Sequence, residues 1–518
     1  MIWTILLIIS FSLAIATHSL HQIHMFQLNT YKPKVQVKWL FTNRRRLITQ
    51  SVGVLLLAAW ILLHLPSGVI AATVIFLITA YLSSKKSYKK PLVYTSRVIR
   101  LLTTLGILLV GAVAATVILR EENVALALIL PGFYIFAPLL VLLSNLINQP
   151  IEKAIRQWYI NDAKKILAGM PRLTVIGVTG SYGKTSVKFF LSKLLSCEYN
   201  VLHTPESYNT PMGIVKTIRN EMKAFHEIFI CEMGAKNVGD IAEICDIVKP
   251  KHGVITAIGP QHLESFHSIE NVLKTKFELA DAVGGKGFLF LNYDNEYIRT
   301  KKEYQNIISY GINPKYSIDY LAYDIQVSSA GTRFKMKDEN KREYEFTTKL
   351  IGTHNVENVA AAIAVANKLG IPMEKLVMQV KQIKPVPHRL QLIKRNSLLI
   401  IDDAYNSNPS GAKAALDTLS MFEGVKILMT PGMIELGSKQ YECNKTFGIQ
   451  ASKVCDYVVL VGEEQTKPIY DGLMEAGFSN ERIRVVSDLQ DGFSFVDHIN
   501  AGGQEKILLL ENDLPDNY

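Results

Sequence analysis

Residues 173–186 read LTVIGVTGSYGKTS, and this stretch decides the fold of the chain. An apolar run over 173–178 leads into a turn of small residues, and an apolar helical pattern follows over 187–195. A buried strand, a tight turn and a helix in this order direct backbone N–H groups and a helix N-terminus at one point, which suits a polyphosphate. Lys184 can reach the β and γ oxygens, and the Thr185 hydroxyl can bind Mg²⁺. We therefore predict a nucleotide-phosphate site here rather than a purely structural turn.

The glycine spacing of this turn departs from that of the strict P-loop. That motif has a glycine five residues before Gly183, where this chain has Val178, and the glycine of the turn is Gly180 instead. The preceding strand and the following helix still favour phosphate binding. The residues predicted to surround the phosphates are Gly180, Ser181, Tyr182, Gly183, Lys184, Thr185 and Ser186.

Charge divides the 518 residues into two unlike parts. Residues 1–150 contain 13 Lys and Arg but only two acidic residues, Glu121 and Glu122, whereas the rest of the chain carries 43 basic and 44 acidic residues. The second part therefore has no overall positive field, which argues against a nucleic-acid-binding protein.

Five apolar runs indicate membrane helices in the first part, at 2–16, 47–65, 67–82, 101–119 and 124–147. Lys and Arg gather after the first and third runs, so five spans with the N-terminus outside place every basic segment and the later domains in the cytoplasm. The first run could instead be a cleaved signal peptide, although no Lys or Arg precedes it. No charged residue lies inside a run, so we expect a multi-pass anchor in the cell membrane rather than a transport path.

Two predicted strands of the second part lead into residues that can bind metal ions. Residues 228–231 form a short apolar run followed by Glu232, and residues 253–258 form another that precedes His262. Ligands of open α/β sheets gather beyond the carboxyl ends of strands, so both side chains are candidate ligands for Mg²⁺. Taken alone, each could also be a capping carboxylate or a solvated histidine.

The helix predicted after Ser268 carries a lysine on its apolar face. At 100° per residue its apolar side chains share one side, and Lys276 lies near the middle of that side. Burial penalises an ammonium group and lowers its pKa, so such a lysine either has a function or extends along the surface to water. We favour a function.

Further polar clusters follow toward the C-terminus. GTHNVEN at 352–358 precedes an alanine-rich helical pattern, HRLQL occupies 388–392, and the apolar strand 398–401 ends in DDAYNSNP. Strand and helix patterns alternate beyond it, which predicts a separate doubly wound domain. The whole chain is thus predicted to be an α/β protein with a helical membrane region at 1–150, a P-loop-type nucleotide-binding central domain at 165–384 and a Rossmann-like C-terminal domain at 385–518.

With these segments in this order, residues 170–518 resemble the Mur ligase superfamily, the ATP-dependent amide ligases of cell-wall peptide synthesis. The segments that carry the resemblance are TGSYGKTS, SYNTPMG, CEMGAKNVGDI, HLESFHS, KTKFELA, GTHNVEN, HRLQL and DDAYNSNP. They are most similar to the members that add D-alanyl-D-alanine to a UDP-muramoyl tripeptide, chiefly through EMGA followed by GDI and through DDAYNSNP.

The resemblance implies four metal-site residues. Thr185, Glu232 and His262 would bind Mg²⁺ between the ATP phosphates and the acceptor. Lys276 occupies the position of a lysine that this superfamily carbamylates with CO₂. Carbamylation would turn a buried cation into an anion able to bind the metal.

The resemblance also implies nucleotide contacts. Asn358 would lie near adenine, while Arg389 and Asp403 of the C-terminal domain would close on the γ-phosphate and Mg²⁺. Asn292 and Asp294 resemble a strand-end pair of the superfamily. The catalytic residues expected are Lys184, Lys276, His262 and Arg389.

Two departures concern the substrate rather than ATP. Members of the group have an N-terminal domain that grips the UDP-sugar, whereas here only about 25 residues separate the last apolar run from the strand at Leu173, and five spans stand in its place. Residues 430–433, TPGM, replace the usual glycine-aspartate-methionine. The acceptor could be the UDP-linked tripeptide, a membrane-borne carboxylate or another carboxylate.

The function expected is therefore an ATP- and Mg²⁺-dependent amide ligase of cell-wall biosynthesis. Its partners would be a peptide-bearing precursor, an amino acid or dipeptide, and the lipid bilayer, with no nucleic acid. One alternative is a related membrane-associated ligase, such as one that builds poly-γ-glutamate. An alternative of another class is a membrane-tethered ATP-binding scaffold without catalysis.

Overall fold

The computed structural model describes residues 2–42, 74, 77, 78, 81, 91–118, 122–206, 208–261, 263–328, 330–395, 398–405, 407–434 and 436–513. The chain divides into two compact units, and the division falls between Trp158 and Tyr159. Each unit is described by itself.

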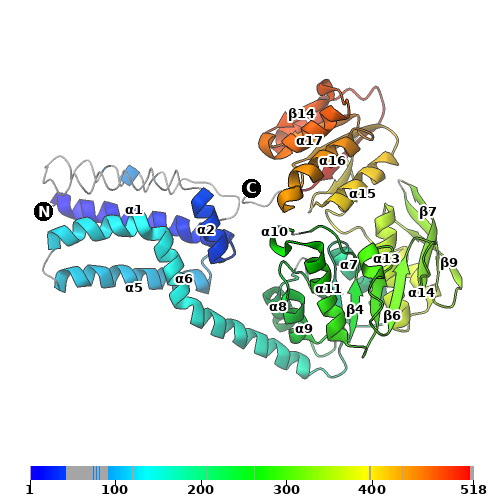
Figure 1. The fold of residues 1–518 in the computed structure, drawn as a ribbon, viewed down its shortest axis with the longest axis horizontal. Helices are drawn as coiled ribbons and strands as arrows, with labels where there is room; N and C mark the ends of the chain where they lie inside the picture. Colours follow the sequence, from blue (N-terminus) through cyan, green and yellow to red (C-terminus); the bar gives the residue numbers. More distant parts are fainter. Residues whose placement is uncertain are drawn as a thin grey trace. The chain divides into compact units, whose positions relative to one another are not determined.

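The first unit is helical in its described residues (Figure 1). Its helices are α1 (Ile2–Leu28), α2 (Pro33–Thr42), α5 (Ser96–Ile118) and the first part of α6 (Glu122–Ala168). Ile23 of α1, Leu101 of α5 and Val141 of α6 belong to one buried cluster. Thr104 Oγ1 also donates a hydrogen bond to Asn148 Oδ1 at 3.0 Å, which ties α5 to α6.

The apolar runs of the sequence correspond only partly to these helices. Helix α1 continues well beyond residue 16, α5 contains almost all of the fourth run, and α6 contains the fifth and extends to Ala168. The run 47–65 and nearly all of 67–82 lie outside the described residues. Among the residues that the structure describes, the Gly132–Ala168 part of α6 is the one helix long and apolar enough to cross a membrane, by length and composition only. The membrane region and its five spans remain a prediction.

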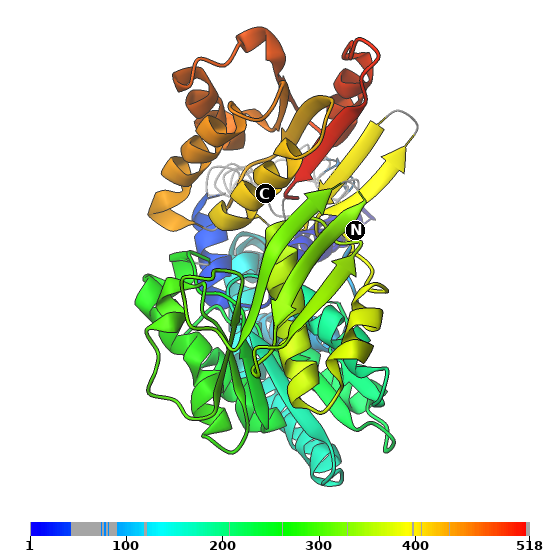
Figure 2. The same ribbon diagram turned by 90° about the vertical axis from the view of Figure 1, so that its right-hand side faces the viewer.

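A nine-stranded sheet forms the centre of the second unit, in the order β2-β3-β1-β4-β5-β6-β7-β8-β9. The strands from β2 to β7 in this order run parallel, and β7, β8 and β9 are antiparallel. These yellow-green antiparallel strands form the edge of the sheet that faces the viewer in Figure 2. The strands are β1 (Thr174–Thr179), β2 (Val201–His203), β3 (Ile228–Glu232), β4 (His252–Ile255), β5 (Leu289–Asn292), β6 (Ile307–Gly311), β7 (Tyr320–Ser328), β8 (Gly331–Lys337) and β9 (Glu343–Thr348).

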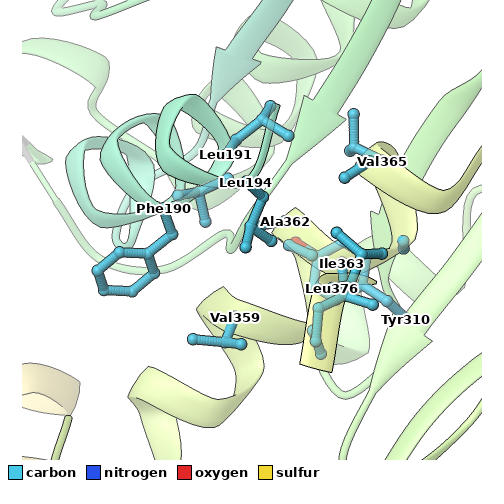
Figure 3. Close-up of a cluster of buried hydrophobic side chains, with 14 of the residues drawn as sticks. Phe190, Leu191, Leu194, Tyr310, Val359, Ala362, Ile363, Val365 and Leu376 are labelled. Carbon is cyan, nitrogen blue, oxygen red and sulfur yellow. The ribbon is translucent and has the colours of Figure 1, made fainter. Parts of the chain in front are cut away.

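Helices cover both faces of this sheet, so the residues of β1, β3 and β4 are almost all buried. On one face lie α7 (Lys184–Leu195), α13 (Thr353–Lys368) and α14 (Met373–Val380), whose side chains share the core drawn in Figure 3. The other core contains side chains of α8 (Pro211–Glu221), α9 (Asp240–Val248) and α11 (Ile269–Val283). Two short helices complete the domain, α10 (Leu263–Phe266) and α12 (Glu296–Arg299).

The C-terminal domain has a six-stranded sheet in the order β10-β11-β15-β12-β13-β14. All neighbours are parallel except β10 and β11, so the domain is doubly wound as predicted. Its strands are β10 (Gln391–Arg395), β11 (Leu398–Asp403), β12 (Val425–Thr430), β13 (Tyr457–Val461), β14 (Ile483–Val486) and β15 (Lys506–Glu511). Its helices are α15 (Pro409–Ser420), α16 (Gln440–Ala451), α17 (Glu463–Glu475) and α18 (Leu489–His498), with short 3-10 turns at Gly437–Lys439 and Asn480–Arg482.

Candidate functional site

The predicted phosphate loop joins β1 to α7 and is held by the segment that follows β4. The backbone N–H of Ser181 donates to the carbonyl of Ala257 at 2.6 Å, and the Tyr182 hydroxyl donates to the carbonyl of Pro260 at 3.1 Å. Gly183, the residue before α7, has φ +79°, and a Cβ there would lie 2.5 Å from Oδ1 of Asn358. Only glycine fits this position without strain. Gly183 has no side chain with which to cap α7, so it leaves the first N–H groups of the helix to an anion.

Lys184 folds back onto this loop. Its Nζ donates to the carbonyls of Gly180 at 2.9 Å and Ser181 at 3.2 Å. Burial lowers the pKa of Lys184 to about 8, Glu232 acts in the opposite direction, and the charge of Arg389 lowers it further. An anion bound at the loop would favour the ammonium form and give it a stronger partner than two carbonyls.

Glu232 is the last residue of β3 and is almost completely buried, with 1% of its side chain exposed. Its Oε1 accepts hydrogen bonds from Thr185 Oγ1 and Asn209 Nδ2, both at 3.1 Å, and its Oε2 lies 3.0 Å from Nζ of Lys188. Burial acts to raise the pKa of Glu232, but Lys188 and Lys184 outweigh it, so the pKa lies below its ordinary value. The predicted ligands Thr185 and Glu232 therefore lie together as two hard oxygen donors, which is the chemistry that Mg²⁺ requires.

Lys188 is a residue of this site that the sequence reading missed. Its side chain is fully buried, it also donates to the carbonyl of Glu206, and its Nζ lies 4.5 Å from the ring centre of Phe189. In the sequence it is one residue of a helical pattern, four positions after Lys184. Its partner Glu232 is remote in the chain, so no local signal marks the pair.

Lys276 lies inside α11 with 2% exposure, as its place on the apolar face predicted. Burial lowers its pKa to about 7, and the nearby charge of Lys184 contributes in the same direction, against Asp240 and Glu278. A large fraction of this amine is therefore neutral near pH 7, and a neutral amine is the nucleophilic form.

Further metal ligands are not defined by the structure. His262 lies outside the described residues, so its role as a ligand stays a prediction. Within the described part of the chain, no three His, Cys, Asp or Glu residues are grouped closely enough to hold a metal ion. A metal here would need ligands other than side chains of these types, such as a hydroxyl, a modified lysine or the phosphates of the nucleotide.

A second polar group surrounds the start of α13. Asn292, at the end of β5, lies 3.5 Å from a carboxyl oxygen of Glu357, and Asn358 follows next to the phosphate loop. Burial and the charge of Asp294 raise the pKa of Glu357 to about 7. The carboxylate of Asp294 accepts hydrogen bonds from the backbone after β6. Asn358 is thus positioned beside the loop, and Glu357 is an acidic neighbour that the sequence reading did not single out.

Arg389 lies between two residues with left-handed backbone, His388 at φ +59° and Leu390 at φ +46°. Its guanidinium stacks over the ring of Tyr405 at 4.3 Å, and its charge lowers the pKa of Lys184 in the same compact unit. Asp403, at the end of β11, accepts a hydrogen bond from the backbone N–H of Leu390 at 3.2 Å. Burial raises the pKa of Asp403 to about 6, against the opposing effect of Arg389.

Glu511 is a second acidic residue at the carboxyl ends of the C-terminal strands, and the sequence alone did not single it out. It is the last residue of β15, where the Ser407 hydroxyl and the Thr430 hydroxyl, the latter at 3.1 Å, donate to its two oxygens. Burial raises its pKa to about 8, and the neighbouring Asp403 adds to this effect.

Comparison with known proteins places both sheets in one family. Residues 178–366 match the family model described as the Mur ligase middle domain, and residues 388–510 match that of the Mur ligase, glutamate ligase domain. The chain is 33% identical over 279 residues to the UDP-N-acetylmuramoyl-tripeptide–D-alanyl-D-alanine ligase of Buchnera aphidicola subsp. Baizongia pistaciae (strain Bp), covering 53% of this chain and 60% of that protein. It is 34% identical over 277 residues to the enzyme of the same name from Bacillus subtilis (strain 168), covering 53% and 59%.

Solved structures agree with the sequence relatives. The crystal structure of MurF ligase from Thermotoga maritima in complex with ADP matches with a TM-score of 0.62 and 25% identity, over 69% of this chain and 80% of that one. The chain spans about 60% of the length of the two curated relatives above, and the two family-model matches fall in its second unit. Through its central and C-terminal domains, the chain belongs to the Mur ligase family.

Proposed function

We propose that the chain is an ATP-dependent amide ligase of cell-wall biosynthesis that joins D-alanyl-D-alanine to a UDP-muramoyl tripeptide. The observation that carries the proposal is the grouping of Lys184, the Thr185–Glu232 pair and buried Lys276 around one phosphate loop. The charge of Arg389 also acts on this group, because it lowers the pKa of Lys184. Binding ATP alone would not need all of these residues. The names of the curated relatives support the choice of substrates.

In this proposal an oxygen of the acceptor carboxylate attacks the γ-phosphorus of ATP and ADP leaves, which gives an acyl phosphate. The incoming amine then attacks the acyl carbon, loses a proton, and expels phosphate to form the amide. Lys184 and Arg389 neutralise the charge spread over the transferring phosphoryl group. Neither step needs a protein nucleophile, because well-oriented reactants can supply roughly 7–11 kcal/mol of the barrier.

Magnesium fits the donors at Thr185 and Glu232, and when bound it would supply charge stabilisation and orientation of the phosphates. Glu232 is held for this task by hydrogen bonds from Thr185 and Asn209. We include carbamylation of Lys276 in the proposal. Its neutral amine would add to the carbon of CO₂ and release one proton to water, which leaves a carbamate anion in place of a buried cation.

The proposed location is the cell membrane, with several spans, the N-terminus outside and both ligase domains in the cytoplasm. The basic segments near Arg44 and Lys85 support this orientation. Between α6 and β1 only residues 169–173 remain, so no folded UDP-binding domain intervenes there. The helical unit would act as the anchor, and the bilayer is a proposed partner.

The test is phosphate release by the purified full-length protein with ATP and Mg²⁺. One arm contains UDP-muramoyl tripeptide with D-alanyl-D-alanine, a second contains glutamate, and a third contains no acceptor. We expect release in the first arm alone, with the amide product detected by mass spectrometry, and its loss in Lys184→Ala but not in Lys453→Ala, an exposed lysine remote in the sequence. Release with glutamate alone would favour the poly-γ-glutamate type, and ATP binding without release in any arm would favour a scaffold.

A further inference from the structure

The central domain has a groove with a volume of about 580 Å³, and the phosphate-loop residues 180–186 are not among the residues that line it. Side chains of α7, Lys349 after β9, and the segment 381–387 after α14 form its walls. The hydrogen bond from Lys193 Nζ to Gln382 Oε1, 3.0 Å long, links two of these walls. The volume lies within the range of ligand-binding pockets, roughly 300–1,000 Å³.

The base of this groove is apolar. Phe189 of α7 is half-buried there, and Ile383 and Val386 are buried beside it. Pro385 and Pro387 also line the groove, and proline rings stiffen this wall because they fix φ. Apolar surface in a concave, stiff site is suited to hold the hydrocarbon part of a ligand.

Four lysines give the rim of the groove a positive charge. It carries Lys193, Lys349, Lys381 and Lys384, and none of the described residues that line the groove is acidic. None of these four forms an ion pair with a described residue, whereas other lysines of the central domain do, as in the Lys368–Glu339 pair at 2.8 Å. Four lysines without ion-pair partners around apolar lining residues match a ligand that is anionic at one end and apolar at the other.

We propose that this groove binds a phosphate-bearing lipid, with the phosphate among the lysines and the hydrocarbon on the apolar base. Nucleic acid would need a longer basic track, and an acidic peptide would leave the apolar base uncovered. The same chain contains the apolar Gly132–Ala168 helix part, which would keep the domain close to such lipids if the proposed membrane location holds. The binding itself does not require that location or ligase activity.

The test uses the purified full-length protein in a nonionic detergent and three soluble probes. These are dihexanoylphosphatidylglycerol, dihexanoylphosphatidylcholine and glycerol 3-phosphate. The readout is the rate at which an acetylating reagent modifies each lysine, measured by peptide mass spectrometry. We expect phosphatidylglycerol to slow modification of Lys349 and Lys384 about fivefold or more, while the exposed Lys453 and Lys467 of the C-terminal domain react unchanged.

Variants sharpen the test. Lys381→Gln with Lys384→Gln is expected to raise the phosphatidylglycerol concentration that half-protects Lys349 about tenfold, while the matched pair Lys453→Gln with Lys467→Gln leaves it unchanged. Equal protection by glycerol 3-phosphate would show a simple anion site, and equal protection by phosphatidylcholine would show an apolar site. Either result, or no protection of the unaltered protein, overturns the proposal. Phosphate release measured in parallel separates this outcome from the fate of the ligase proposal.

Discussion

Replacing Lys188 by methionine tests whether the buried pair with Glu232 stabilises the central domain. The Lys188 and Glu232 side chains are 0% and 1% exposed and lie 3.0 Å apart. In Lys188→Met the Glu232 carboxylate therefore stays buried but loses one of its neighbouring cations. Removing one partner of a buried ion pair costs about 3–5 kcal/mol. Methionine nearly fills the same volume, so we expect little additional cost from a cavity.

Amide hydrogen exchange is the appropriate assay. All four tryptophans, the last of them Trp158, precede the second unit, so tryptophan fluorescence would not follow the central domain. A loss of about 3 kcal/mol corresponds to exchange roughly a hundredfold faster in peptides of α7 and β3 when exchange follows the opening equilibrium. The matched control is Lys193→Met on the same helix, whose lysine makes an exposed hydrogen bond to Gln382 and should change exchange less than about fivefold.

The double variant decides between charge and packing. In Lys188→Met with Glu232→Gln neither charge of this pair is left, and the amide keeps partners in Thr185 and Asn209. We expect this double variant to exchange more slowly than Lys188→Met alone by about tenfold. If Lys188→Met behaves like Lys193→Met, or if the double variant is as labile as Lys188→Met, the reasoning about the ion pair is wrong.

Three further outcomes follow from the site. Lys276→Ala should lose ligase turnover and regain part of it with acetate or another short carboxylic acid, and turnover without added acid would contradict the carbamate. In the unaltered protein, ¹³C-labelled bicarbonate should give a carbamate NMR signal. This signal should grow as pH rises through about 7, because the neutral form of the Lys276 amine increases there. Gly183→Ala should weaken ATP binding by calorimetry about tenfold or more, because its Cβ would meet Asn358, and unchanged affinity would refute the fit described for the loop. Glu511 has a pKa of about 8 in the folded state, above that of the unfolded chain, so the folded state holds an extra proton and the free energy of unfolding should fall as pH rises from about 5 to 8. Glu511→Gln should flatten this pH dependence, measured by hydrogen exchange in peptides of β15. An unchanged slope would contradict the raised pKa of Glu511.

The sequence predicted those parts of the site that depend on a single strand, turn or helix. The strand, turn and helix around Gly183 appear as β1, the loop and α7, because apolar periodicity and a glycine turn act over a few residues. Lys276 is buried because a helix of fixed period carries it to the apolar side of α11. Glu232 follows from the end of a short apolar strand.

Pairings between distant segments could not be predicted in this way. Lys188 meets Glu232 where α7 packs on β3, and Glu511 at the end of β15 meets Ser407 in the loop between β11 and α15. The antiparallel strands β7, β8 and β9 were not foreseen, because register depends on which strands become neighbours. Helix α1 likewise extends beyond its apolar run, through polar residues such as Gln22 that packing buries.

The two hydrogen bonds from Lys184 to the carbonyls of Gly180 and Ser181 have a consequence for selectivity among nucleotides. A phosphate that binds this ammonium must replace these two acceptors, so the free energy gained is the difference between the two sets of interactions. A chain of phosphates that reaches both the lysine and the helix N-terminus would therefore gain more than a single phosphate group that reaches one of them. The phosphate loop would thus favour nucleotides with several phosphates over small single anions.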